Sequence, residues 1–297
     1  MEGMTRYVTP TDPPTTGWDL HCHTVFSDGT ETPDAMLAEA RARGLAGVAI
    51  TDHDTTAGWP DAERAATDRG LPLLRGTEIT AEDDGVSVHM LGLQYDPRSV
   101  HITRLFAVTR QARLERTRRM VELMSADLPI TWRSVLAQVR EGGRTTIGRP
   151  HIADALVAAG VYRTRSEAFA DAVSADSKYY IPTPSPTTHE VVRAVNEAGG
   201  VVVIAHPGDL SRNRRLLSDR QIEALIDEGL DGLEVWHRGN PPEQRERLLG
   251  IARAHGLLVT GGSDWHGAGK PNRLGENLTD EDTVRRIVER GAIGLWR

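Results

Sequence analysis

The chain is organised around Asp19-Leu20-His21-Cys22-His23, which Ser27-Asp28-Gly29 follows at once. Apolar Leu20 and Cys22 alternate with polar residues, and this period of two is typical of a strand. Residues two apart on a strand share a face, so the imidazoles of His21 and His23 project the same way. Two parallel imidazoles with a carboxylate a few residues on provide half of a ligand set for a divalent metal. Alone, the pair could equally arise by chance.

Apolar, strand-like runs recur along the chain, and several end in His, Asp or Glu. Gly47 to Thr51 leads into Asp52-His53-Asp54, and Val201 to Ala205 leads into His206. Helical patterns separate most of these runs, as in α/β units with parallel strands, although Asp83-Asp84-Gly85 is a turn signal between two of them. We predict about seven strands, enough for a closed or nearly closed (β/α)7 barrel, at 19–23, 47–51, 71–79, 86–91, 201–205, 232–236 and 257–260.

The alternation stops near Pro97. From about residue 99 to 177 only helical patterns occur, at about 100–125, 132–140, 150–159 and 166–173. This interval therefore predicts a small helical domain inserted into the barrel. The predicted organisation is a flexible leader (1–17), a discontinuous barrel (18–98 and 180–297) and a helical insertion that caps the substrate (99–179).

Composition excludes several classes of protein. Cys22 is the single cysteine, so a disulfide framework and a thiolate zinc cluster are excluded. The net charge of −7 argues against a generally basic nucleic-acid-binding surface. No apolar run approaches the roughly 20 residues that span a bilayer, and the Thr/Pro-rich start reads as neither signal peptide nor anchor. We predict a cytoplasmic protein without a membrane or a stable protein partner.

Polar residues gather where the predicted strands end. In barrels of alternating strands and helices, functional groups lie at the carboxyl ends of the strands. Six of the eleven histidines fall at such positions, a distribution that random placement would seldom produce. Nitrogen and oxygen ligands without sulfur suit two or three divalent ions of the Mn, Fe or Zn type. The candidate ligands are His21, His23, Asp28, His53, Glu78, His89, His206, Asp264 and His266.

Five of these stretches resemble the motifs of the polymerase-and-histidinol-phosphatase (PHP) family: His21-Cys22-His23-Thr24 with Ser27-Asp28-Gly29, Ile50-Thr51-Asp52-His53-Asp54, Gly76-Thr77-Glu78, His206-Pro207 and Ser263-Asp264-Trp265-His266. The resemblance covers about residues 18–98 and 180–270. It implies a distorted seven-stranded barrel whose trinuclear metal site hydrolyses phosphate esters.

The resemblance also implies how the ligands divide among the metals. One metal would be held by His21, His23, Glu78 and Asp264. Glu78 would bridge to a second metal completed by His89 and His206, and a third would be held by Asp28, His53 and His266. The position of Asp28 is a histidine in some relatives of the family.

The chemistry agrees with hydrolysis. Clustered divalent ions lower the pKa of a bound water and so provide hydroxide that attacks phosphorus near neutral pH. The chain contains no Gly-x-Ser-x-Gly nucleophile elbow. Asp54, beside His53, either orients that histidine, handles a proton or caps the following helix, and we favour the orienting or capping role. The group that protonates the leaving oxygen stays open.

The insertion carries cations that narrow the substrate. Arg113 and Arg116 are three apart on a predicted helix and share a face, and Arg149 opens another helix. Arginine at an exposed helix surface is usually only solvated. Arg116, Arg149 and Lys178 nevertheless resemble cations in the insert of one PHP branch, the 3',5'-nucleoside bisphosphate phosphatases and the 5'-to-3' exoribonucleases of short RNA. In that branch they hold a 5'-phosphate, a task that suits the two parallel hydrogen bonds of arginine.

Three functions follow from this reasoning. We predict first a metal-dependent phosphoesterase that removes the 3'-phosphate from nucleoside 3',5'-bisphosphates and also trims short RNA. The second is a phosphatase for another small metabolite such as histidinol phosphate. The third is a metal-binding regulatory module without turnover, which should lack ligands; the chain lacks none of those that the family pattern requires.

Overall fold

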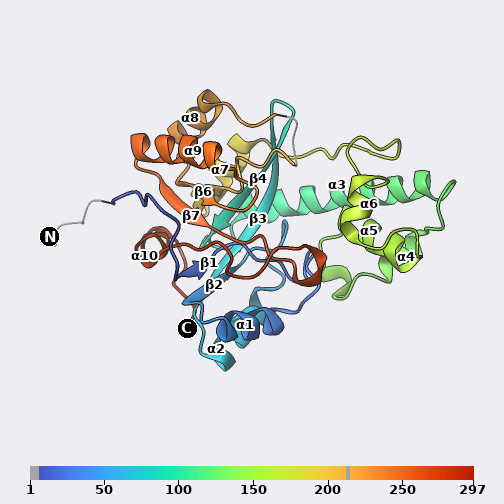
Figure 1. Cartoon of the computed structure of the whole chain (residues 1–297), viewed down its shortest axis with the longest axis horizontal. Coiled ribbons are helices and arrows are strands. Elements are labelled where there is room, and N and C mark those ends of the chain that lie inside the picture. Colours follow the sequence, from blue (N-terminus) through green and yellow to red (C-terminus); the bar gives the residue numbers. More distant parts are fainter. Residues whose placement is uncertain (1–6, 212–214) are drawn as a thin grey trace.

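A computed structural model describes residues 7–211 and 215–297 and contains a seven-stranded sheet with the strands in chain order (Figure 1). The predicted α/β class and seven-stranded barrel are confirmed. The strands are β1 (Trp18–Asp19), β2 (Gly47–Ile50), β3 (Leu73–Asp83), β4 (Val86–Leu93), β5 (Val201–Ile204), β6 (Gly232–Trp236) and β7 (Leu258–Gly261).

Strand β4 runs against its neighbours and departs from the parallel arrangement that alternating strands and helices indicate. β4 pairs antiparallel with both β3 and β5, whereas the other neighbouring strands are parallel. The reason is the turn at Asp84-Gly85, where both residues adopt positive φ angles of 46° and 74° and reverse the chain within two residues. His89 therefore reaches the metal-ligand rim from the N-terminal half of its strand.

The sheet closes almost completely into a barrel. The backbone N–H of Leu20 donates to the carbonyl of Gly261 at 3.4 Å, and Cys22 forms an isolated parallel bridge with Trp265. These two contacts place the segment after β1 beside the segment after β7. The first and last motifs of the sequence therefore meet at one rim.

Helices cover the outside of the barrel. They begin where the sequence offers caps; for example, Thr32 accepts a hydrogen bond from Ala35 N and Pro33 opens the first helix. The helices are α1 (Pro33–Ala42), α2 (Trp59–Arg69), α7 (Thr188–Glu197), α8 (Asp219–Asp227), α9 (Pro242–His255) and α10 (Glu281–Arg290), with a short 3₁₀ turn at Gly267–Gly269.

Alternate strand residues serve two different cores. Val48, Ile50 and their counterparts on other strands face outward and pack against the helices. Ala49, Leu74 and their counterparts face inward and pack with Val284 and Ile287 of α10, which therefore covers the end of the barrel away from the histidines. Burial on both faces explains why the strands read as continuous apolar runs.

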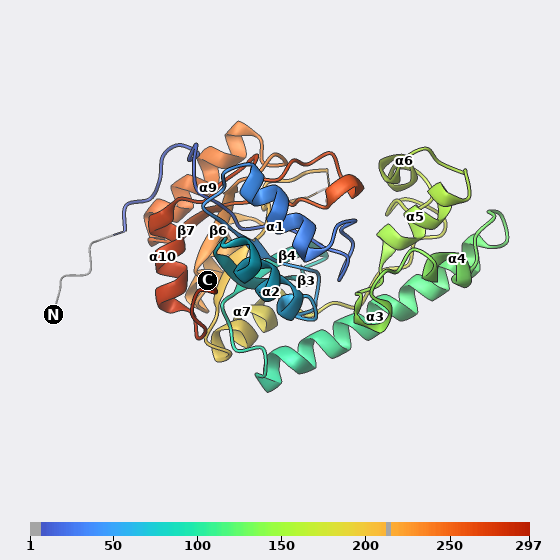
Figure 2. The same cartoon turned by 90° about the horizontal axis from the view of Figure 1, so that it is seen from below.

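The interval after β4 is helical, with its own apolar core. It comprises α3 (Val100–Met124), α4 (Trp132–Leu136), a 3₁₀ turn (Gly142–Arg144), α5 (Arg149–Ala158) and α6 (Arg165–Ala170). Met120, Ile152 and Leu156 are central to this core, whereas Ile102 and Phe106 of α3 belong to the barrel core. Figure 2 shows α3 running from the barrel to α4, α5 and α6, which gather over its C-terminal half. Helix α3 thus anchors the helical insert to the barrel.

The predicted leader is only partly described, since residues 1–6 lie outside the described part of the chain. Tyr7 lies against the barrel, where its hydroxyl is 3.1 Å from Thr283 Oγ1 and accepts a hydrogen bond from Val259 N. Across the described residues, none of the helices combines the length and apolar character that crossing a bilayer requires.

Candidate metal centre

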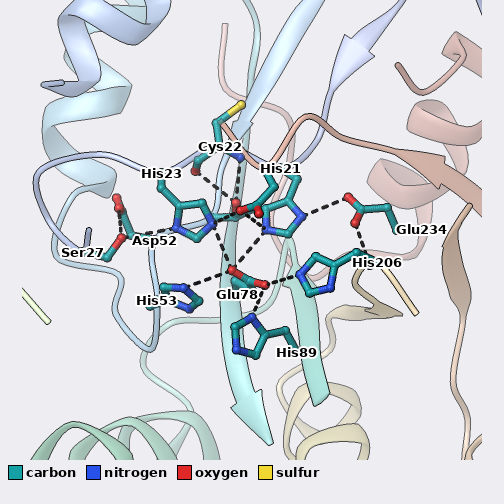
Figure 3. Close-up of polar contacts among 12 residues, drawn as sticks. His21, Cys22, His23, Ser27, Asp52, His53, Glu78, His89, His206 and Glu234 are labelled. Carbon is teal, nitrogen blue, oxygen red and sulfur yellow. Dashed lines mark hydrogen bonds and ion pairs between the residues drawn. The ribbon is translucent and has the colours of Figure 1, made fainter. Parts of the chain in front are cut away.

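Glu78 lies at the centre of the polar cluster inside the barrel rim (Figure 3). It is fully buried in the middle of β3. Its Oε2 is 3.0 Å from His23 Nε2, 3.2 Å from His21 Nε2 and 3.4 Å from His53 Nε2. One carboxylate oxygen therefore faces three imidazoles from two different segments of the chain.

The other oxygen of Glu78 faces the opposite side of the barrel. Oε1 is 3.0 Å from His206 Nε2 and makes a short contact with His89 Nδ1. His206 follows β5 and His89 lies on β4, so this half of the cluster comes from the antiparallel part of the sheet. Because its two oxygens face different sides of the cluster, Glu78 would be able to contact a cation on either side.

Two further carboxylates complete the cluster. Asp264 Oδ1 is 3.4 Å from His23 Nε2 and 3.6 Å from His21 Nε2. Asp28 Oδ1 is 3.2 Å from His266 Nε2. Both carboxylates are buried, and they come from the loops that the first and last motifs form.

All nine predicted ligands thus lie in one cluster. The cluster contains three sets of residues. Within each set, the potential ligand atoms all lie within 4.8 Å of one another, and some residues belong to more than one set. Two sets differ from the implied division: His53 joins Glu78 and His89 where His206 is expected, and His23 also joins the set around Asp28. The sets are His21, His23, Glu78 and Asp264; His23, Asp28, His53 and His266; and His53, Glu78 and His89.

The buried atoms of this cluster fit a divalent cation. Unpaired polar atoms in a protein interior are costly and rare. Besides His53 Nδ1, six atoms of the candidate ligands are buried and face one another at 3.0–3.6 Å, yet they make no hydrogen bond with any described residue. A cation would satisfy them together, and the nitrogen and oxygen donors suit Mn, Fe or Zn. The atoms are His21 Nε2, His23 Nε2, Asp28 Oδ1, Glu78 Oε2, Asp264 Oδ1 and His266 Nε2.

Glu234 positions two of the candidate ligands. It is fully buried on β6, and its Oε1 is 3.0 Å from His21 Nδ1 while its Oε2 accepts a hydrogen bond from His206 N at 2.8 Å. Nδ1–H of His21 donates to this carboxylate, so Nε2, which faces Glu78 and Asp264, is the atom that would bind a cation. Gly262 allows the approach, because a Cβ there would lie 2.5 Å from Glu234 Oε1. Glu234 is not among the residues predicted from the sequence, although a lone carboxylate within a buried apolar strand is a usable signal.

His266 is oriented in the same way by the backbone. Its Nδ1 lies 2.8 Å from the carbonyl oxygen of Asp264 and donates to it. The ring therefore presents the Nε2 lone pair to the cluster, which is the form that binds metals. Burial and the neighbouring Lys270 ammonium lower the pKa of His266 to about 4, so the ring is neutral near pH 7.

Two aspartates outside the predicted set hold the loops in place. Asp52 accepts hydrogen bonds from the N–H of Thr24, the hydroxyl of Thr24 and the hydroxyl of Ser27 at 2.6–2.7 Å. Asp19 accepts from the N–H groups of Ser263 and Gly275 at 2.9 and 2.7 Å. These bonds fix the loops that carry the first and last motifs.

Backbone strain marks the same place. Among the described residues other than glycine, five have positive φ, and three of these are Asp54, His206 and Asp264, at 52°, 32° and 52°. Such conformations persist only where surrounding contacts enforce them, and they cluster at functional sites. Two of the three are candidate ligands, so the strain serves to aim ligand side chains.

The charges of the cluster stabilise its carboxylates. Burial alone would raise the pKa of the Glu78 carboxyl, but the imidazoles of His89, His21 and His53 hold it well below its usual value. The pKa of Asp264 is likewise well below its usual value, because the Lys270 ammonium 2.7 Å away opposes the effect of burial. Both side chains are therefore anionic at neutral pH, as metal ligands must be.

Asp54 connects the barrel to the insert and does not cap the following helix. Its Oδ1 accepts from Thr80 N at 2.8 Å, and its Oδ2 lies 3.1 Å from Arg113 Nη1. Helix α2 instead begins after Gly58, without a side-chain cap. The capping interpretation is therefore wrong, and Arg113 is neutralised by this ion pair.

Arg116 and Arg149 both lie near one aromatic ring. Their guanidinium carbons lie 5.3 and 5.6 Å from the centroid of the Tyr180 ring. Arg149 also donates to the carbonyl of Val173 at 3.2 Å and lies over the Phe169 ring. Burial and repulsion from Arg149 lower the pKa of Arg116. No carboxylate of the described residues pairs with Arg116.

Lys178 lies apart from these arginines. Its Nζ is 2.8 Å from Asp127 Oδ2, its side chain is 69% exposed, and its other close neighbour is the Tyr179 ring. Of the three predicted substrate contacts, the structure brings together Arg116 and Arg149.

Fold and site together define a metal-dependent phosphoesterase. The barrel with histidine and carboxylate ligands at one rim matches the PHP domain model over residues 19–198. The chain belongs to the PHP domain family.

Two curated relatives match nearly the whole chain. The 5'-3' exoribonuclease Rnm of Salmonella typhimurium is 32% identical and aligns over 94% of this chain and 92% of its own length. The 3',5'-nucleoside bisphosphate phosphatase of Chromobacterium violaceum is also 32% identical, over 92% of this chain and 95% of its own length. The crystal structure of a metal-dependent phosphoesterase from Bifidobacterium adolescentis is 73% identical, with a TM-score of 0.94 over 95% of this chain and 98% of that chain.

Proposed function

We propose that the protein removes the 3'-phosphate from nucleoside 3',5'-bisphosphates and that the same site releases 5'-nucleotides from short RNA. Both reactions break the bond between phosphorus and a ribose 3'-oxygen, and both substrates carry a second phosphate on the 5' side. The names of the two curated relatives support this substrate class.

The observation that carries the proposal is the pair of arginines around Tyr180. Arg116 is a partly buried cation without a carboxylate partner among the described residues, and its Nε makes no hydrogen bond. Burying an unpaired charge is costly, whereas an anion between Arg116 and Arg149 would offset that cost. A phosphate held there is the distal group of a substrate whose other phosphate is at the metal centre.

The residues of the barrel would then serve the scissile phosphate. The nine candidate ligands would hold two or three divalent cations, with Mn, Fe or Zn as the proposed metals. Such cations supply positive charge to phosphoryl oxygens and make a bound water more acidic. Glu234 and the Asp264 carbonyl keep His21 and His266 oriented, and the insert caps the substrate.

A substrate comparison tests this function. Purified protein loaded with Mn²⁺ should release phosphate from adenosine 3',5'-bisphosphate much faster than from AMP or histidinol phosphate. Equal rates, or faster hydrolysis of histidinol phosphate, would remove the nucleotide assignment and leave a phosphatase of another metabolite. A 5'-phosphorylated RNA dinucleotide should release 5'-AMP, while the same dinucleotide without its 5'-phosphate should react more slowly.

A further inference from the structure

A cleft of about 410 Å³ separates the rim of the barrel from the insert. Ser27 and Asp28 lie on its barrel wall, and His151, Asp154 and Arg165 lie on its insert wall. Arg165 spans the two walls, since it pairs with Asp154 and donates to the carbonyl oxygen of Asp28 at 2.7 Å. The cleft therefore reaches from a candidate metal ligand to the start of α5.

His151 has a fixed orientation on this wall. It is 4% exposed, and its Nδ1 accepts a hydrogen bond from the backbone N–H of Gly148 at 3.2 Å. An imidazole nitrogen that accepts a hydrogen bond carries no proton, so a neutral ring must carry its proton on Nε2. Among the described residues, nothing hydrogen-bonds to Nε2 of His151. The ring is thus a hydrogen-bond donor without an acceptor beside the cleft.

This arrangement is the reverse of that in the candidate ligands. In His21 and His266, Nδ1 donates and Nε2 faces the cluster. In His151, Nδ1 accepts and Nε2 donates, so Nε2 cannot bind a metal in this geometry. Burial lowers the pKa of His151, against the pull of Asp28 and Asp154, and keeps the ring neutral. His151 is therefore suited to contacting substrate.

We propose that Nε2–H of His151 donates a hydrogen bond to the leaving oxygen of the phosphate ester. This inference rests on the proposed function and addresses the 3'-oxygen of its substrate. Hydrolysis breaks the bond between phosphorus and that oxygen. Water supplies both the oxygen that joins phosphorus and the proton that ends on the leaving oxygen, so His151 keeps its own proton. The hydrogen bond strengthens as negative charge develops on the leaving oxygen, and it thereby lowers the barrier.

Arg149 and His151 both lie in the first turn of α5, where side chains two apart project in different directions. A nucleotide with its 5'-phosphate between Arg116 and Arg149 would extend its 3'-oxygen from the insert toward the rim. One helix would then contact both ends of the leaving nucleotide.

A leaving-group comparison tests the proposal. His151→Phe removes the donor and keeps a ring, and kcat for adenosine 3',5'-bisphosphate should fall about 100-fold, the cost of one donor to a developing anion. The fall in kcat should be far smaller with 4-nitrophenyl phosphate, because the nitrophenyl ring itself stabilises the negative charge on the leaving oxygen without a hydrogen-bond donor. His151→Gln retains an N–H donor and should recover part of the loss, and His255→Gln, at an exposed histidine, is the control. Equal losses on both substrates would overturn the proposal.

Further measurements distinguish the proposed role of His151 from effects of the substitution on folding or metal binding, and from an error in the proposed substrate. Metal content of His151→Phe should equal that of wild type, and a lower content would make His151 a ligand. In ¹⁵N NMR of histidine-labelled protein, His151 should carry its proton on Nε2, and a proton on Nδ1 would overturn the argument. If wild type hydrolyses only aryl and simple alkyl phosphates, the proposed nucleotide substrate is wrong, and the same comparison between those two esters still decides the role of His151.

Discussion

The barrel rim and the helical insert solve opposite electrostatic problems. At the rim, Glu78, Asp28 and Asp264 crowd around buried histidine Nε2 atoms at 3.0–3.6 Å, several of which make no hydrogen bond with the described residues, so the site suits cations. In the insert, Arg116 lies beside Arg149 without a carboxylate partner in the described structure, so that site needs an anion. The proposed substrate, a phosphate ester with two anionic ends, would satisfy both regions at once. Under the proposed function, the rim would therefore perform the chemistry and the insert would select the substrate.

The two regions also differ in how they are held. The rim is fixed by hydrogen bonds to buried carboxylates such as Asp52 and Asp19. The insert is fixed by its own apolar core and by α3, whose first half packs on the barrel. Substitutions at the rim should therefore act on metal binding and every substrate, whereas substitutions in the insert should act on substrate choice.

The largest effect is expected at the rim, from Glu78→Gln. Removing the central carboxylate should lower metal content and reduce activity on every ester by about 1,000-fold, because charge stabilisation by bound metals supplies several kcal/mol. Elemental analysis of the dialysed variant, alongside activity on 4-nitrophenyl phosphate, measures both effects. A variant with full metal content and full activity would break the assignment of the rim as the reacting site.

Glu234→Gln tests the rim without removing a candidate metal ligand, because Glu234 acts on the rim through His21 and the backbone of His206. Metal affinity should fall about 10- to 100-fold, as for other carboxylates that orient histidine ligands. Competition with a chelator measures the affinity, and excess Mn²⁺ should restore most of the activity. Unchanged affinity would show that Glu234 serves folding alone, which thermal unfolding of the metal-free variant would detect.

The insert should behave differently. Arg149→Ala should lower kcat/KM on adenosine 3',5'-bisphosphate about 10- to 100-fold, since charge-assisted hydrogen bonds contribute roughly 1.5–3 kcal/mol. Activity on 4-nitrophenyl phosphate and metal content should stay near those of wild type. Parallel losses on the two substrates would show that Arg149 does not read the distal phosphate, and the contrast between rim and insert would fail.

The smallest effect is expected from Lys178→Ala. This side chain is 69% exposed and pairs with Asp127 on the surface, and such pairs contribute about 0–1 kcal/mol. Activity on the bisphosphate should change less than about threefold, in line with that range. A loss as large as that of Arg149→Ala would restore Lys178 to the predicted substrate contacts and imply that the insert rearranges around its ligand.

More of the rim than of the insert could be predicted from the sequence. His21-Cys22-His23 and Ser263-Asp264-Trp265-His266 are local motifs, and barrel topology alone brings strand ends together. The antiparallel direction of β4 is not part of the sequence prediction. The turn at Asp84-Gly85 is recognisable, but the prediction does not include the antiparallel pairing of the two strands that it joins. Glu234 was missed because its role arises only from contact with His21, 213 residues away along the chain.

The insert depends on packing that spacing does not reveal. Arg113 and Arg116 share a helix face in the sequence pattern, yet Arg113 reaches Asp54 while Arg116 reaches the Tyr180 ring. Lys178, two residues from Tyr180, faces Asp127 instead. Similarly, the sequence places His151 at a helix start, and only the bond from Gly148 N defines which ring nitrogen donates.

The central claim is that the rim gathers divalent cations around Glu78, and crystallography of protein soaked in Mn²⁺ tests it most directly. Data collected on both sides of the manganese absorption edge locate the metal independently of any assumed mechanism. We expect anomalous peaks on both sides of the Glu78 carboxylate, one of them bounded by His21, His23 and Asp264. Fully occupied peaks elsewhere in the protein, with none beside Glu78, would contradict it.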